Sequence, residues 1–363
     1  MNCRVIPVGS MATEQVRSVL ASAGHAPSAH NSQPWRFRCT TRAIELYADL
    51  DRALPITDPD QQELLIACGA AVLNLRLAIR AQGRRYDLRL LPDPKNPNLL
   101  AALRPTGSHP ITAAERSLAE AMTKRRTHRR PFASTPVPIA ARNELRRAAE
   151  IEQAWLATLH GPQLSALQPL LRAAHRVQMS TPGFMAEWRH WVNQADALRD
   201  GPRGSDIGWR PEPTGIWVSR DVAGVAPGRE PEPEPLTMVI GSSDDSRLSR
   251  LRAGQAMQRV LLAATAAGLA ASFVTPLVEV PHTRADLRVI LGGGVWPQAV
   301  LRLGYATPAP GAPHRPAASP AGANAGATLV NTGRTRLTTD CATIERAVQR
   351  ASTGVKTRSG GPT

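Results

Sequence analysis

Hydroxyl and amide side chains stand close together near the N-terminus, in the stretch APSAHNSQPW at residues 26–35. Pro27 and Pro34 bound them, and each proline fixes its own φ angle and removes a backbone donor. Between the prolines, Asn31 and Gln33 each offer a donor and an acceptor from one planar group. Such a set suits the edge of a flat heterocycle that alternates N–H and C=O groups. The alternative is a capped turn between a helix and a strand, where Ser and Asn are common.

The stretch resembles the flavin-edge motif of the nitroreductase family, APSxxNxQPW. Its form HNSQPW, followed by a strand, by Asp51-Arg52 and by Thr57-Asp58, resembles the Acg branch of that family. The resemblance covers roughly residues 13–316. It implies that the cofactor FMN is bound by Pro27, Ser28, Asn31 and Gln33.

A second chemical signal is the basic run KRRTHRRPF at residues 124–132. Taken alone, it is a solvated helix end, where cations suit the helix dipole. It also resembles the nitroreductase motif RRSxRxF, which grips the FMN phosphate, although one additional residue precedes Phe132. The resemblance implies phosphate contacts from Arg125, Thr127 and Arg129, and a further one from Arg315 near the end of the matching region.

Gly268 follows a strongly amphipathic helix predicted over residues 245–267. The helix and the Gly-Leu turn after it resemble the family's core helix and the turn beside the flavin ring. Gly268 is therefore a candidate for close approach of the backbone to the ring. It is equally well explained as the C-cap of the helix, a position that glycine commonly fills.

Together with the family's geometry, the order of the two motifs implies the architecture. In ordinary nitroreductases the basic motif precedes the amide motif, and each flavin lies between two chains of a dimer. Here the order is reversed within one chain. The resemblance therefore implies an α+β fold with a central, mostly antiparallel sheet flanked by helices. It also implies two nitroreductase-like halves in one chain, a pseudo-dimer that keeps one flavin site.

Hydrophobic periodicity predicts the elements that position these motifs. Helices are predicted over residues 13–22, 113–125, 139–151, 163–178, 184–192 and 284–290, and strands over residues 35–39, 43–47, 86–91, 153–159, 236–241 and 297–303. A long helix is predicted to begin at Thr57 or Asp58, with Pro59 in its first turn. Ala70 and Ala71 in this helix would let another helix pack closely.

The resemblance implies an N-terminal extension (1–12), a first half (13–112) and a second half (113–316), and composition marks a low-complexity tail (317–363). The tail is expected to be mostly disordered, because few large apolar residues remain in it. A loop at about 179–235 is rich in Trp, Gly and Pro. Its length indicates a functional segment or disorder, and its aromatic residues favour a lid rather than a linker. The resemblance to the Acg branch implies that this region folds over the flavin.

The formal net charge of +15 raises the possibility of a nucleic-acid partner, because basic faces neutralise phosphates. However, nearly all of the charge is Arg, it is dispersed along the chain, and no nucleic-acid-binding signature accompanies it. The four cysteines show no spacing typical of zinc sites or disulfide frameworks. With no long uncharged apolar stretch and no signal-peptide pattern, we expect a cytoplasmic protein without membrane or nucleic-acid partners.

Two functions remain open. The first is an NAD(P)H-dependent oxidoreductase that passes hydride through FMN to nitroaromatic or quinone-like acceptors, as a monomer or a homodimer. The second is a protein that sequesters FMN beneath the lid with little or no turnover. In either case no catalytic side chain is expected, because the flavin itself performs the redox chemistry.

Overall fold

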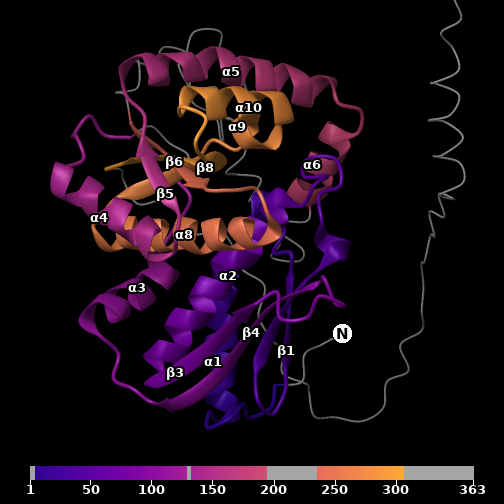
Figure 1. The fold of residues 1–363 in the computed structure, drawn as a ribbon, viewed down its shortest axis with the longest axis vertical. Coiled ribbons are helices and arrows are strands. Elements are labelled where there is room, and N and C mark those ends of the chain that lie inside the picture. Colours follow the sequence, from indigo (N-terminus) through magenta and orange to yellow (C-terminus); the bar gives the residue numbers. More distant parts are fainter. Residues whose placement is uncertain (1–4, 129–131, 194–234, 306–363) are drawn as a thin grey trace, which may run out of the picture. The chain divides into compact units, whose positions relative to one another are not determined.

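The computed structural model describes residues 5–128, 132–193 and 235–305 (Figure 1), which all belong to one compact unit spanning residues 1–319. The first half contains, in chain order, α1 (Thr13–Ala23), the 3-10 helix η1 (Ala29–Asn31), β1 (Trp35–Cys39), β2 (Ile44–Ala48), the 3-10 helix η2 (Leu50–Arg52), α2 (Gln62–Ala81), β3 (Arg84–Leu90) and β4 (Leu99–Ser108). The described part of the second half contains α3 (Ala113–Lys124), α4 (Ile139–Ile151), β5 (Trp155–Thr158), α5 (Gly161–Ser180), α6 (Phe184–Asn193), β6 (Leu236–Ser242), α8 (Arg247–Ala266), β7 (Ala270–Phe273), α9 (Pro276–Glu279), α10 (Pro281–Ile290) and β8 (Trp296–Gly304).

The strands form two four-stranded antiparallel sheets with the same topology. The first sheet has the order β1-β2-β4-β3, and the second has the order β5-β6-β8-β7. Both sheets also carry a β-bulge at the matching place, after Leu46 in β2 and after Ile240 in β6. The predicted α+β class and antiparallel pairing are confirmed. The expected central sheet is present twice, once in each half.

Two long helices form the centre of the molecule. Helices α2 and α8 are each 20 residues long and pack against each other between the two sheets (Figure 1). They touch at Gly69 and Gly254, which occupy the same position in each helix. A Cβ added at Gly69 would lie 2.2 Å from the carbonyl oxygen of Leu251, and one at Gly254 would lie 2.1 Å from that of Ile66. Only glycine allows this contact, which the neighbouring alanines had been expected to provide.

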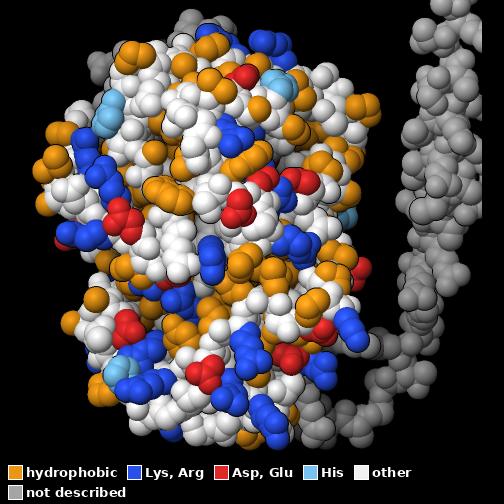
Figure 2. Space-filling model, viewed as in Figure 1, with side chains coloured by type: hydrophobic (Ala, Val, Ile, Leu, Met, Phe, Trp, Pro, Cys, Tyr) orange, Lys and Arg blue, Asp and Glu red, His pale blue; other side chains and the backbone are white. Residues whose placement is uncertain are grey.

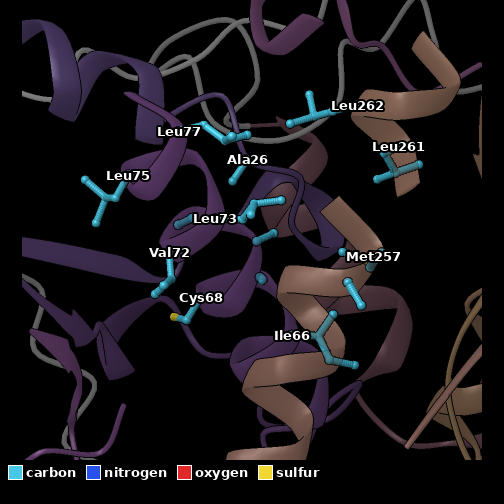
Figure 3. Close-up of a cluster of buried hydrophobic side chains, with 14 of the residues drawn as sticks. Ala26, Ile66, Cys68, Val72, Leu73, Leu75, Leu77, Met257, Leu261 and Leu262 are labelled. Atoms are coloured by element: carbon cyan, nitrogen blue, oxygen red, sulfur yellow. The ribbon is translucent and has the colours of Figure 1, made fainter. Parts of the chain in front are cut away.

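The core around this crossing is apolar. Figure 3 shows side chains of α2 and α8 facing each other, among them Ile66 and Leu73 on one helix and Met257 on the other. Helix α1 packs on α2, α4 packs on α8, and α3 packs on both central helices. By length and composition α2 could cross a membrane, but 89% of its most apolar window is buried, as expected for a core helix.

The start of α2 differs from the prediction. The helix begins at Gln62, after Gln61 adopts a left-handed conformation with φ 59°. Asp58 still caps it, because its carboxylate accepts hydrogen bonds from the backbone N–H groups of Glu63 (3.0 Å) and Leu64 (2.8 Å). Burial raises the pKa of Asp58 to about 7, against the opposing effect of these two bonds.

The two sheets differ in what covers their outer faces. A second buried cluster, made by α5, α9, α10 and strands of the second sheet, includes Leu167, Val239, Leu277 and Val300. The first sheet has charged residues at its exposed outer positions. Figure 2 shows Lys and Arg side chains gathered over the lower region of the view, where this sheet lies in Figure 1. The second half therefore has an additional layer that the first half lacks.

Candidate functional site

The predicted amide motif forms a strained loop, residues 27–34, which we call the amide loop. It joins α1 to β1 and contains η1. Three of its residues other than glycine have positive φ angles: His30 (51°), Asn31 (54°) and Gln33 (50°). Such conformations cost on the order of 1–3 kcal/mol each and concentrate at functional sites. A simple capped turn needs no such strain, which favours the binding interpretation of the motif.

Internal hydrogen bonds hold the amide loop in this shape. The Ser28 hydroxyl oxygen accepts a 2.9 Å hydrogen bond from the backbone N–H of Gln33. The Gln33 side chain is 1% exposed, and its Nε2 lies 3.4 Å from the carbonyl oxygen of Asn31. Asn31 itself is half-buried and Pro27 is buried. Ser28 therefore has a structural role in addition to its predicted FMN contact.

The end of the loop is anchored to the first half. The carbonyl oxygen of Pro34 accepts hydrogen bonds from the backbone N–H of Asp49 (3.1 Å) and from the thiol of Cys68 in α2 (3.3 Å). Arg52 donates through Nε to the carbonyl oxygen of Ser32 at 2.5 Å. The Arg52 side chain thus contacts the backbone between two strained residues, a role that the sequence did not reveal.

Helix α3 positions the basic motif. Thr112 and Glu115 form a capping box at its start, and Glu115 also makes two hydrogen bonds with the buried Arg80 of α2, at 2.8 and 3.0 Å. These bonds hold the pKa of Glu115 low, at about 2. The helix ends at Lys124, so Arg125 is its C-cap and is only 6% exposed. The predicted phosphate-binding arginine is therefore buried rather than part of a solvated helix end.

Thr127 lies next to the second sheet. It forms a parallel β-bridge with Ala271 of β7, and the backbone N–H of His128 donates to the carbonyl oxygen of Ala271 at 2.7 Å. Phe132 then packs against Gly304 of β8, where an added Cβ would lie 2.9 Å from its ring. Thr127 thus lies beside β7 and Phe132 beside β8. Arg129 and Arg315, the other predicted phosphate contacts, lie outside the described residues.

Gly268 lies in the turn between α8 and β7, two residues before β7 begins. The Leu269 N–H donates to Ala264 (2.8 Å) and the Gly268 N–H to Thr265 (3.1 Å), which together form a Schellman cap. The φ angle of Gly268 is +73°, and a Cβ added there would meet nothing within 4 Å. Gly268 is therefore a helix cap with open space beside it. Its approach to a flavin ring stays a prediction.

The structure joins part of the predicted site directly. The bridge from Thr127 to Ala271 brings Arg125 and Thr127 near the turn at Gly268. Ala26, which precedes the amide loop, belongs to the same buried cluster as Leu262 of α8, and Figure 3 shows it beside Leu73 and Leu77. The amide loop thus starts over the central helices, and the basic segment flanks the end of α8.

Helix α6, which was predicted over residues 184–192, adds one residue that sequence analysis did not single out, Glu187. It begins the segment predicted as a lid and packs against η1. Its Glu187 accepts hydrogen bonds from Ile56 and Thr57, and its buried Trp191 lies against Arg52, with the guanidinium carbon 5.2 Å from the ring centroid. Residues 194–234, most of the predicted lid, lie outside the described residues.

These features fit a flat, anionic cofactor. A strained loop carries two amide side chains, a buried arginine lies at a helix end, and open space lies beside Gly268. Within the parts of the chain that the structure describes, there is no group of three or more His, Cys, Asp or Glu that could hold a metal ion. The fold and the site together define an α+β protein with two sheets of the same topology and one amide loop.

Comparison with known proteins identifies the family. No family model matches the chain. The chain is 32% identical over 314 residues to the Mycobacterium tuberculosis protein named "Putative NAD(P)H nitroreductase Rv3131", covering 83% of this chain and 89% of that protein. It is 30% identical over 319 residues to "Putative NAD(P)H nitroreductase acg" from the same species, covering 86% and 96%. The chain belongs to the nitroreductase family.

Among solved structures, the chain is similar to a nitroreductase with bound FMN from Bacteroides fragilis. The TM-score is 0.34 and the sequence identity 15%, with 61% of this chain and 97% of that chain covered.

Proposed function

We propose that the chain binds FMN and transfers hydride from NAD(P)H through it to a nitroaromatic or quinone-like acceptor. The observation that carries this proposal is the strained amide loop, in which Asn31 and Gln33 both adopt positive φ angles, in a chain of the nitroreductase family. The loop would meet the ring edge, while Pro27 and Ser28 fix its start. Bound FMN supplies the redox chemistry, and the protein orients it.

Arg125, Thr127, Arg129 and Arg315 are proposed to hold the phosphate. Each charge-assisted hydrogen bond contributes roughly 1.5–3 kcal/mol, so one such bond from each of the three arginines would together approach the ~8 kcal/mol of micromolar affinity. The burial of Arg125 supports this assignment, because a partly desolvated guanidinium binds an anion more strongly than an exposed one. Gly268 would leave room for the ring.

We also propose that the chain is a pseudo-dimer, with halves at residues 13–112 and 113–316. The shared strand order, the matching bulges and the glycine contact between α2 and α8 support an internal duplication. The amide loop belongs to the first half and the basic segment to the second. One FMN per chain follows from this arrangement, in a cytoplasmic protein that is a monomer or a homodimer.

A second candidate function is the sequestration of FMN without turnover. The packing of α6 against η1 favours it, because the helix covers one side of the amide loop. Both functions use the same cofactor contacts. They differ in whether nicotinamide reaches the ring.

An anaerobic titration with NADPH, followed through the flavin absorption band, tests the proposal. Rapid bleaching of the FMN-loaded protein indicates an oxidoreductase. Bleaching by dithionite but not by NADPH indicates sequestration. A protein that cannot be loaded with FMN would contradict both functions.

A further inference from the structure

Helix α6 belongs to the second half in sequence but contacts the first half, in part through the carboxylate of Glu187. Glu187 accepts hydrogen bonds from the backbone N–H groups of Ile56 (3.1 Å) and Thr57 (2.9 Å), and from the hydroxyl of Thr57 (2.6 Å). Hydrogen bonds to an ionised acceptor are stronger than neutral ones. Glu187 thus fixes the helix beside the segment that follows Arg52.

Arg52 connects this helix to the amide loop. Its Nε donates to the carbonyl oxygen of Ser32 at 2.5 Å, and its guanidinium carbon lies 5.2 Å from the ring centroid of Trp191. Trp191 is 5% exposed. A guanidinium over an aromatic face is attracted to it, more strongly when water is excluded. One side chain therefore binds the loop through its edge and α6 through its face.

The amide loop needs such support. Ser32 lies between Asn31 and Gln33, which both have positive φ angles. Strained backbone persists only where surrounding contacts over-determine it. Loss of the hydrogen bond from Arg52 would let this part of the loop relax, and the amide groups of Asn31 and Gln33 would change position together.

We propose that Arg52 is a positioning residue that couples the amide loop to α6, so that docking of α6 and binding of FMN strengthen each other. This coupling rests on the proposed FMN site. By linkage, a helix that stabilises the binding conformation raises the affinity for the ligand, and the ligand stabilises the docked helix by the same factor. The coupling gives a role to one residue of each of the Asp51-Arg52 and Thr57-Asp58 pairs, because Arg52 and Thr57 contact α6.

The test uses two variants of α6 that leave the amide loop untouched. Trp191→Leu removes the aromatic face beside Arg52. Glu187→Gln removes the negative charge of the side chain that accepts hydrogen bonds from Thr57. Trp155→Leu is the control, because this half-exposed tryptophan lies on β5. Hydrogen exchange at the backbone amides of residues 31–33 is measured without FMN, and the FMN dissociation constant is measured by flavin fluorescence.

Both α6 variants are expected to exchange faster than wild type at the amides of residues 31–33 and to weaken FMN binding by about fivefold or more, the lower range of typical coupling. The control should change neither. In a double-mutant cycle, Arg52→Met and Trp191→Leu should be less than additive, because each removes the same connection.

Exchange at the wild-type rate in both α6 variants would overturn the coupling, as would faster exchange with an unchanged FMN dissociation constant. Failure of the wild-type protein to bind FMN would instead overturn the proposed function. The exchange measurement would then still decide whether α6 supports the amide loop, since it needs no cofactor.

Discussion

The two halves differ at the connection that leads into the first strand of each sheet. In the first half, α1 is joined to β1 through residues 24–34, which include the amide loop. In the second half, residues 152–154 alone join α4 to β5. The strands that follow have the same neighbours in their sheets. The chemistry of the proposed site thus lies in a loop that only one of two equivalent connections carries.

The short connection is closed by a buried ion-pair cluster. Glu152 is 7% exposed, and its carboxylate binds Arg76 of α2 and Arg259 of α8. Arg76 also donates to Gln255 of α8 at 2.8 Å. At this connection, the charged side chains of Glu152, Arg76 and Arg259 therefore form ion pairs with each other inside the protein. The comparison teaches that the same framework supports a binding loop on one side and a structural cluster on the other.

The outer faces of the sheets show a similar divergence. Glu45, Ala102 and Arg89 lie in a row across the first sheet. The matching row of the second sheet is Val239, Val300 and Val274, which lies beneath α5 and α9. The additional helices of the second half, α5 and α9, therefore cover strands that carry apolar residues at these positions.

Removal of Glu152 should have the largest effect on stability and little effect on FMN binding. Glu152→Ala leaves Arg76 and Arg259 without their shared carboxylate, so it should lower the free energy of unfolding by about 3–5 kcal/mol. Urea denaturation measures this loss, with the exposed Glu150→Ala on the same helix as control. A large loss of FMN affinity in the folded variant would place Glu152 in the site and contradict the comparison.

The glycine contact tests the shared centre of the two halves. Gly254→Ala pushes α2 and α8 apart, because the new Cβ would lie 2.1 Å from the Ile66 carbonyl oxygen. The free energy of unfolding should fall by about 3 kcal/mol, and Gly69→Ala should have a similar effect. Gly294→Ala, which meets nothing within 4 Å, is the control. A loss of stability in only one of the two variants, Gly254→Ala or Gly69→Ala, would argue against equivalent roles for the two glycines.

The caps of α2 and α8 should respond differently to pH. The pKa of Asp58 is raised to about 7 from 3.8, so its carboxyl ionises in the unfolded chain before it does so in the native protein. Native stability should therefore fall as the pH rises from 5.5 to 8, by on the order of 2 kcal/mol. Asp58→Asn should remove this part of the pH dependence in denaturation measurements.

The cap of α8 is the internal control. The Ser246 hydroxyl accepts a hydrogen bond from Ser249 N–H at 3.2 Å and carries no charge. Ser246→Ala should lower stability by about 1 kcal/mol, equally at both pH values. The same pH dependence in wild type and Asp58→Asn would show that Asp58 does not titrate in this range.

Removal of Arg125 should have a modest effect in free energy, and the effect should fall on FMN binding. Arg125→Ala should weaken FMN binding by tenfold or more, about 1.4 kcal/mol. Isothermal titration with FMN measures the change. Arg116→Ala, at an exposed position on α3, controls for net charge. An unchanged dissociation constant would remove Arg125 from the phosphate site.

Much of the fold was predictable because its helices and strands show clear periodicity. The bounds predicted for β1 and α4 match those observed. Strand β4 was not predicted, because Leu99–Ser108 begins with a continuous apolar run and contains Pro105. The predicted start of α2 was wrong. Asp58 does cap the helix through its side chain, but it lies four residues before the first helical residue, Gln62.

The proposed site was predictable from the sequence only as separate motifs. The stretch at residues 26–35 indicated its chemistry, but not the positive φ angles of His30, Asn31 and Gln33. The contact of Glu187 with Thr57 joins residues 130 positions apart and leaves no local signal in the sequence. Tertiary packing alone creates it.

The number of FMN molecules bound per chain tests the central claim most directly. Isothermal titration of the purified full-length chain should give one FMN per chain, because only one of the two equivalent connections carries an amide loop. Arg125→Ala should weaken the binding of this one FMN. Two FMN molecules per chain would contradict the single site, and no binding would contradict the assignment of the amide loop.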